Sequence, residues 1–279
     1  CKAEMRIFFI TALLVLTGTR FPLMGVPAEK ETEAVLQRLF GKLAASRQDQ
    51  DKKAINDSIV LIIDNYAASD TVMEHSFSRI RNLGQITSRN SKLKIITWNL
   101  LLENEKSRYF CYFVNNSGKG NIVYKLVGTY REEPVKTDIE YSGKDWYGAL
   151  YYDLRPAGKK DDSYWILLGI DLGNPSVTRK IIDAVSFNAD GSVTFGRKIF
   201  LSGKESRFRE VLEYNPEAVV SLRFFSDKTI VFDHLVPVSP SLKGMKEHYA
   251  PDFSYDAYTL ERGGVWRFVS DFDARNSKE

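Results

Sequence analysis

The sequence predicts an α+β protein in which two to three N-terminal helices pack on a large, mainly antiparallel, strongly twisted β-meander, folded like a sandwich or an open barrel. Apolar residues recur every three or four positions through residues 29–84, which is the period of a helix. Beyond about residue 92 apolar and polar residues alternate, in segments rich in aromatic and β-branched side chains. We therefore divide the chain into a signal peptide (1–28), an N-terminal helical segment (29–88) and a β-rich domain (89–279).

Residues 1–28 show the order of regions that is typical of a signal peptide. Lys2 and Arg6 precede an apolar run over 7–16, and the segment ends in Val26-Pro27-Ala28, with small residues where a signal peptidase cleaves. Gly18-Thr19-Arg20 interrupts the run well before the roughly twenty apolar residues that a spanning helix needs. We expect cleavage after Ala28, export to the periplasm or the exterior, and no transmembrane segment in the mature chain.

Two amphipathic helices are expected after the signal peptide, and start and stop signals in the sequence predict a third. The apolar residues of the first two keep the helical spacing: Val35, Leu36, Leu39, Phe40 and Leu43, then Ile55, Ile59, Ile62, Ile63 and Tyr66. A third helix is predicted over residues 71–83. It would begin with the capping-box pattern Thr71-Val72-Met73-Glu74 and end before Gly84, a natural C-cap.

Twelve strands are expected in the second part of the chain. They cover residues 93–103, 108–115, 121–127, 146–154, 164–172, 180–188, 192–200, 208–214, 219–226, 229–235, 256–261 and 265–272. Short turn signals separate them and favour antiparallel neighbours, because a parallel crossover needs about a dozen residues. Residues 164–170 are nearly all apolar, which predicts a strand covered on both faces, with the N-terminal helices as the expected cover.

Several stretches of the chain resemble a family of exported, uncharacterised proteins typical of Bacteroidota. They are Lys94-Ile95-Ile96-Thr97-Trp98-Asn99-Leu100, Trp146-Tyr147-Gly148-Ala149-Leu150-Tyr151-Tyr152, Leu167-Leu168-Gly169-Ile170-Asp171, Ile230-Val231-Phe232-Asp233-His234-Leu235, residues 249–258 and residues 271–276. The resemblance implies export and a layout of helices followed by sheet, and it brings no established activity, ligand or catalytic residue. The chain departs from the family pattern at Ala250 and Ile170, where glycine and tryptophan are usual.

The charge balance implies no charge-driven partner. The formal net charge is +3, and Lys and Arg are spread among almost as many carboxylates, so we expect no nucleic-acid binding. The predicted mature chain keeps one cysteine, Cys111, which cannot form an internal disulfide and is expected to be a buried apolar thiol.

A set of acidic and imidazole side chains near the C-terminus contains the candidate catalytic residues: Asp233, His234, His248, Asp252 and Asp256, followed by Asp271 and Asp273. Such groups could hold a hard cation or act as an acid/base pair. No spacing among them matches a dedicated motif, so no metal site is assigned. The alternative is a packed histidine with turn-capping aspartates. The strand pattern predicts that Asp233 and His234 are mostly buried and hydrogen-bonded.

Aromatic residues around the predicted strand 146–154 are the candidate ligand-binding set: Trp146, Tyr147, Tyr151 and Asp153. An exposed tyrosine pair beside a carboxylate could stack on a sugar or grip a peptide, whereas the alternative is ordinary cross-strand packing. The leading hypothesis is a non-catalytic binding or interaction module of the cell envelope, with a glycan, a peptide or an envelope protein as its partner. The rival is a hydrolase or metal-dependent enzyme that uses the Asp/His set. The sequence does not identify a cofactor.

Expression in an exporting host should yield a mature protein that begins near Glu29 and lies outside the cytoplasm, because the three regions of 1–28 direct cleavage after Ala28. N-terminal sequencing of the purified protein tests this. A cytosolic protein that still begins at Met5 would contradict it.

Overall fold

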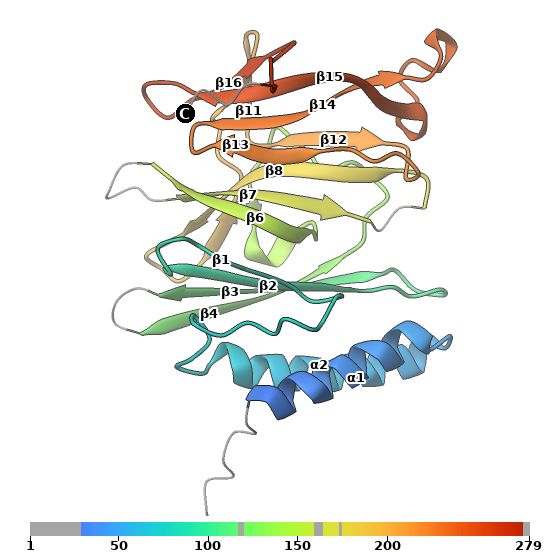
Figure 1. Ribbon diagram of the computed structural model, residues 1–279, viewed down its shortest axis with the longest axis vertical. Helices are drawn as coiled ribbons and strands as arrows, with labels where there is room; N and C mark the ends of the chain where they lie inside the picture. Colours follow the sequence, from blue (N-terminus) through green and yellow to red (C-terminus); the bar gives the residue numbers. More distant parts are fainter. Residues whose placement is uncertain (1–28, 117–119, 159–163, 173–174, 276–279) are drawn as a thin grey trace, which may run out of the picture.

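The computed structural model describes residues 29–116, 120–158, 164–172 and 175–275, so the predicted signal peptide lies outside the described residues. Four layers are stacked on one another: a pair of helices and three β-sheets (Figure 1). The predicted α+β architecture with a large, mostly antiparallel β region is confirmed. Within the described residues none of the three sheets closes into a barrel.

The helices and the first sheet form one end of the stack. The helices are α1 (Glu29–Ala45) and α2 (Asp49–Ala67). The helix-side sheet contains, in spatial order, β1 (Gly84–Thr87), β2 (Leu93–Leu100), β3 (Arg108–Asn116) and β4 (Asn121–Thr129). These four strands are a simple antiparallel meander.

The middle sheet runs in the order β5 (Tyr141–Ser142), β9 (Val193–Phe195), β8 (Thr178–Phe187), β7 (Tyr164–Asp171) and β6 (Leu150–Ala157), and β12 (Glu210–Tyr214) also pairs with β8. The outer sheet runs β11 (Glu205–Arg207), β10 (Phe200–Ser202), β16 (Trp266–Val269), β15 (Tyr249–Leu260), β14 (Thr229–Pro237) and β13 (Leu222–Ser226). Three short 3-10 helices lie between strands: η1 (Gly143–Asp145), η2 (Pro240–Leu242) and η3 (Lys246–His248).

The predicted strand 192–200 is divided between two sheets. Gly196 lies between β9 and β10 with φ +97°, a conformation that residues other than glycine rarely adopt, and a Cβ there would collide with the guanidinium of Arg209. The chain therefore leaves the middle sheet at Gly196 and enters the outer sheet at Phe200, where β10 pairs in parallel with β16.

Period-two alternation lets the central strands present apolar side chains to both faces. On β2, Ile96 and Trp98 face the helices, whereas Leu93 and Ile95 face the middle sheet. The indole nitrogen of Trp98 donates to Asn56 Oδ1 of α2 over 2.9 Å, so the helix pair is positioned by a buried hydrogen bond as well as by apolar contact.

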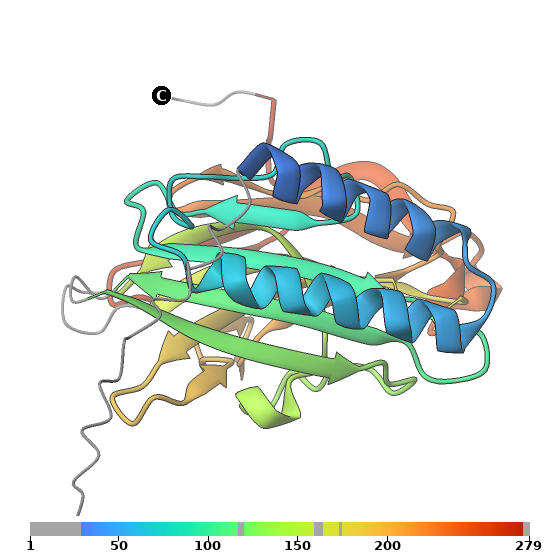
Figure 2. The ribbon, with the colours of Figure 1, turned by 90° about the horizontal axis from the view of Figure 1, so that it is seen from below.

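The strand at 164–171 is covered on both faces as predicted, but the prediction that the N-terminal helices cover it was wrong. Leu167 of β7 packs toward the helix-side sheet, and Ile166 and Leu168 pack toward the outer sheet. The amphipathic helices cover β2 and β3 instead (Figure 2). Apolar runs show that a strand is buried on two sides without showing which layer buries it.

The predicted third helix does not form. Residues 68–74 make turns and residues 75–83 are irregular, and Gly84 begins β1 rather than capping a helix. A single turn exists at the predicted capping box, where the amides of Glu74 and His75 donate to the carbonyl of Thr71.

Side chains from the sheet explain why residues 75–83 do not form a helix. The amide of Gln85 bonds both the N–H and the carbonyl of Phe77, at 3.2 and 2.9 Å, which replaces the bonds of a helical turn. Lys94 Nζ donates to the carbonyl of His75 and to Ser76 Oγ. The apolar side chains of the segment, including Ile80 and Leu83, still pack in the helix-side core. Tertiary contacts thus override the local helical signal.

Two predictions about composition can be compared with the structure. Cys111 on β3 is fully buried, as predicted, and burial raises the pKa of its thiol well above the usual value. Within the described residues, we find no helix with the length and apolarity that a bilayer crossing requires.

A buried ion pair fastens the segment 131–140 to the middle sheet. Arg209 Nε lies 2.9 Å from Asp183 Oδ2, and both side chains are fully buried. The remaining guanidinium nitrogens donate to the carbonyls of Lys136, Ile139 and Phe195. Arg209 therefore holds the non-strand segment 131–140 against the middle sheet.

Breaking this pair should destabilise the protein strongly, because the partner left behind is a buried, uncompensated charge. We expect Arg209→Met or Asp183→Asn to lower the free energy of unfolding by about 3 to 5 kcal/mol, measured by urea denaturation. The matched control is Asp273→Asn, which breaks the exposed pair with Arg275 and should cost at most about 1 kcal/mol. Equal losses in the buried and exposed variants would contradict the role assigned to Arg209.

Candidate functional site

The aromatic residues predicted to form an exposed ligand-binding surface are buried, so that prediction was wrong. Tyr147 is 4% and Tyr151 is 2% exposed, and Trp146 is equally enclosed between the helix-side and middle sheets. Trp146 Nε1 donates to the hydroxyl of Tyr151 over 2.9 Å, and the hydroxyl of Tyr147 donates to Asp183 over 2.7 Å. The alternative of aromatic packing describes this set.

Two backbone irregularities account for the error. Strand β6 begins at Leu150 rather than at Trp146, after Gly148 turns the chain with φ +87°. A bulge between Tyr151 and Asp153 then shifts the register with β7, so counting by twos from Trp146 assigns the wrong face. Asp153 itself bonds Arg155 Nη1 at 2.6 Å and is not free to bind a ligand.

The C-terminal acidic and imidazole residues are partly brought together in a groove between β12 and the strands β14 and β15. Its volume is 270 Å³, and Asp233, His234 and Asp256 line it together with Glu210 and Lys246. His248 and Asp252 do not line the groove. The structure thus unites three of the five candidate catalytic residues and separates two from them.

His234 and Asp256 form the one close imidazole–carboxylate contact of this groove among the described residues. His234 Nδ1 lies 2.8 Å from Asp256 Oδ2, and the histidine side chain is 42% exposed. This hydrogen bond raises the pKa of His234, and the nearby carboxylates of Asp252 and Asp271 add to the effect. The pair can therefore hold a proton or present a charged imidazole to a ligand.

Asp233 accepts a hydrogen bond from the backbone amide of Ser221 over 2.7 Å, as the prediction of a backbone partner required. Both Asp233 and His234 are half-buried rather than mostly buried. The reason is a bulge: Asp233 pairs with Tyr255 and Leu235 with Pro251, so His234 faces three residues of β15. The bulge turns His234 toward the surface and interrupts the alternation on which the burial prediction was based.

Two of the other acidic residues, Asp252 and Asp273, have local partners. Asp252 accepts from the amide and hydroxyl of Ser254, and Asp273 pairs with Arg275. Within the described part of the chain no group of three or more His, Cys, Asp or Glu side chains is arranged to hold a metal ion. The groove offers a proton-binding pair, His234 and Asp256, and further hydrogen-bonding groups.

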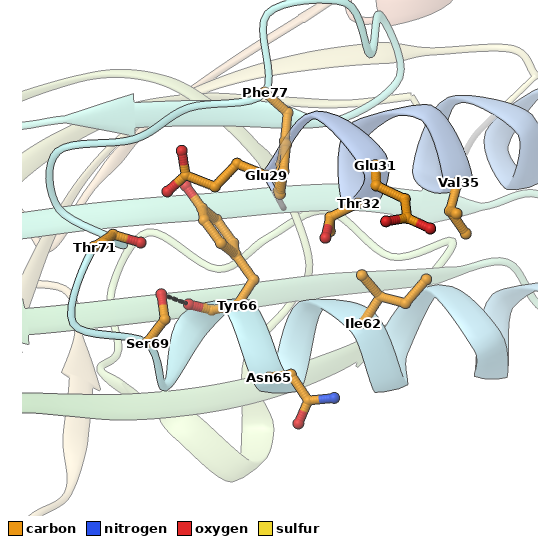
Figure 3. Close-up of a pocket in the computed structure, with 10 residues that line it drawn as sticks. All are labelled: Glu29, Glu31, Thr32, Val35, Ile62, Asn65, Tyr66, Ser69, Thr71 and Phe77. Carbon is orange, nitrogen blue, oxygen red and sulfur yellow. Dashed lines mark hydrogen bonds between the residues drawn. The ribbon is translucent and has the colours of Figure 1, made fainter. Parts of the chain in front are cut away.

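A second site was not identified from the sequence: an apolar pocket of 190 Å³ between α1, α2 and the segment 69–77 (Figure 3). Thr32 and Val35 of α1 face Ile62 and Tyr66 of α2 across it, and Phe77 closes one side. Glu29 and Glu31 belong to the first turn of α1 and also line it. The pocket exists because residues 69–77 are not helical, which is why the periodicity of α1 and α2 alone could not reveal it.

Buried polar groups fix the floor of this pocket. The hydroxyl of Tyr66 donates to the carbonyl of His75 over 2.6 Å and accepts from Lys94 Nζ at 3.0 Å. Burial lowers the pKa of Lys94 to about 8, and burial together with Glu29 raises the pKa of Tyr66. Tyr66 is held by two partners, so the aromatic wall of the pocket is already in place without a ligand.

The His234–Asp256 contact should make stability depend on pH. A raised pKa means that the folded state binds the proton of His234 more tightly than the unfolded state does. The resulting stabilisation is complete at pH values below the unfolded-state pKa of about 6.5, and it is lost as the pH rises through the folded-state pKa. We expect the free energy of unfolding to fall by less than about 1 kcal/mol over this pH range, because the imidazole is partly solvated. NMR titration of His234 should show a lower pKa in Asp256→Asn and a smaller decrease in Asp252→Asn. An unchanged midpoint in Asp256→Asn would contradict the assigned cause.

Comparisons with family models and with curated proteins found no match. The resemblance to exported proteins of Bacteroidota therefore stays a prediction from the stretches quoted above. The function has to be inferred from the chemistry of the groove and of the apolar pocket.

Proposed function

We propose that the protein is a non-catalytic binding module of the cell envelope and that it binds peptides through the apolar pocket between α1, α2 and the segment 69–77. The observation that supports this most directly is a surface pocket with mostly apolar walls, 190 Å³ in volume, which is large enough for a bulky side chain. An engineered apolar cavity of about 150 Å³ binds benzene.

The lining favours a peptide over a glycan. A sugar ring needs several hydrogen-bonding groups and an exposed aromatic face. Thr32, Asn65, Ser69 and Thr71 also line the pocket, but the surface that it exposes is mostly apolar, with Val35, Ile62 and Phe77 among its walls. Glu29 and Glu31 place two carboxylates at the start of α1, which exceed the single positive charge of the α-amino group in a mature chain that begins at Glu29. The best ligand is therefore a large apolar side chain with a positively charged neighbour in the same peptide.

The location in the cell envelope is supported by the signal-peptide pattern of residues 1–28 and by the resemblance to exported proteins. An extracytoplasmic binding module meets many unfolded or processed peptides. This part of the proposal is independent of the pocket and is tested by the N-terminal sequencing described above.

A second candidate function is acid/base catalysis in the groove between β12 and the outer sheet. It is favoured by one observation: Asp256 orients His234 through a 2.8 Å contact while the imidazole stays partly exposed. Hydrolysis of a model ester or glycoside that His234→Gln abolishes, without a change in melting temperature, would favour this candidate over the binding module.

Binding should be measured by fluorescence polarisation with three labelled peptides that share a scaffold and carry Lys-Phe-Lys, Glu-Phe-Glu or Lys-Ser-Lys at the centre. We expect saturable binding of the first and at least about tenfold weaker binding of the other two, because they lose the charge match or the apolar anchor. Val35→Trp should fill the pocket and weaken binding of the first peptide by a similar factor.

The matched control is Arg38→Trp, one turn further along α1 on an exposed position that does not line the pocket. It should bind like the wild type. Equal affinities in Val35→Trp and Arg38→Trp would move the site elsewhere, and binding of envelope glycans that only Val35→Trp weakens would keep the pocket but reject the peptide.

A further inference from the structure

Strand β4 is an unusually open edge for this protein. It has nine residues, pairs with β3 along its whole length without a register shift, and contains no proline. In the part of the chain that the structure describes, no strand pairs with its other side, and Figure 2 shows it at the margin of the sheet beside α2. A long, regular edge offers a row of unpaired backbone groups to another strand.

The other sheet edges are short or irregular. Strands β1, β5 and β11 have four, two and three residues. Strand β12 has five residues, and β13 has five with a register shift against β14. Strand β6 has eight residues but carries a bulge and Pro156. Short length, bulges and proline are usual devices that prevent edge-to-edge pairing, and β4 has none of these three. The one charged residue of β4 is Lys125, which is paired with Asp64.

Three of the five exposed side chains of β4 are apolar: Ile122, Val123 and Val127. Val123 is 37% and Val127 is 47% exposed, on the same face as Lys125. Lys125 Nζ lies 2.9 Å from both carboxylate oxygens of Asp64 on α2, so its charge is already compensated. Leu61, one helical turn before Asp64, is exposed as well.

We infer that β4 pairs antiparallel with β4 of a second copy of this chain, in a symmetric dimer whose two-fold axis passes at Lys125. This register overlaps all nine residues and joins the two helix-side sheets into one. It places Val123 opposite Val127 of the other copy, and Tyr124 opposite Leu126 of the other copy. An isologous interface requires such self-complementarity.

The sequence of β4 favours a second copy over an unrelated peptide. Both pairs of apolar residues match on both faces of the sheet, and directly opposite side chains are the unit of sheet stabilisation. The two lysines at the centre do not meet as bare like charges, because Asp64 of each copy neutralises its own Lys125. An unrelated strand would have to reproduce this pattern by chance.

Sedimentation velocity over a wide range of protein concentration should show a monomer–dimer equilibrium. The double variant Val123→Lys and Val127→Lys places like charges opposite each other at two positions and should raise the dimer Kd at least about tenfold. Mixing it with a Val123→Glu and Val127→Glu variant should restore association as a heterodimer. The matched control is Val219→Lys, at an exposed valine away from β4, which should dimerise like the wild type.

The register can be tested by cross-linking. One preparation carries Val123→Cys and is mixed with another that carries Val127→Cys, since opposite positions in an antiparallel pair are close enough for a disulfide. Mild oxidation should link the mixed preparation and neither variant alone. A protein that is monomeric at every concentration, or a dimer that the double lysine variant and Val219→Lys affect equally, would overturn the inference.

Discussion

The guanidinium of Arg209 joins four parts of the chain inside the middle layer. It pairs with Asp183 on β8 and donates to backbone carbonyls of the segment 131–140 and of β9, while Tyr147 shares the same carboxylate. A charged pair with no exposed surface is tolerated only when its polar atoms find partners, and here each of the three guanidinium nitrogens donates to at least one acceptor. The position of β9, the loop and the aromatic cluster, and hence the packing of the helix-side sheet on the middle sheet, all depend on this one residue.

Most of the fold could be predicted because strong periodicity survives tertiary packing. The helical spacing at Leu36 and Phe40 and the apolar run at 164–170 both identified elements that exist. Long-range facts could not be read in the same way. The pairing of β10 with β16 and the layer that covers β7 are set by residues distant in sequence. The contact of Gln85 with Phe77 spans only eight residues, but it is made by a side chain and leaves no trace in the apolar periodicity.

The candidate sites were harder to predict than the fold because each depends on an irregularity. A bulge exposes His234, another changes the face on which Tyr151 lies, and a non-helical segment creates the apolar pocket. The sequence identified Asp256 and His234 as chemically relevant residues, and their contact follows from a strand register that one sequence does not reveal. Phe77 and Val35 are apolar and belong to no binding motif, so the pocket can be identified only from the three-dimensional structure.

The parallel pairing of β10 with β16 also has a consequence for biosynthesis. The helices and the four-stranded meander use only neighbouring segments, so these contacts are available as soon as the first half of the chain has been made. Strand β10 lies between β11 and β16 in the outer sheet, and Phe200 cannot meet Trp266 until residue 266 has been synthesised. The apolar face of β7 and β8 that this sheet covers therefore stays open while residues 201–266 are being made, and a chaperone that shields it has its greatest effect at that stage.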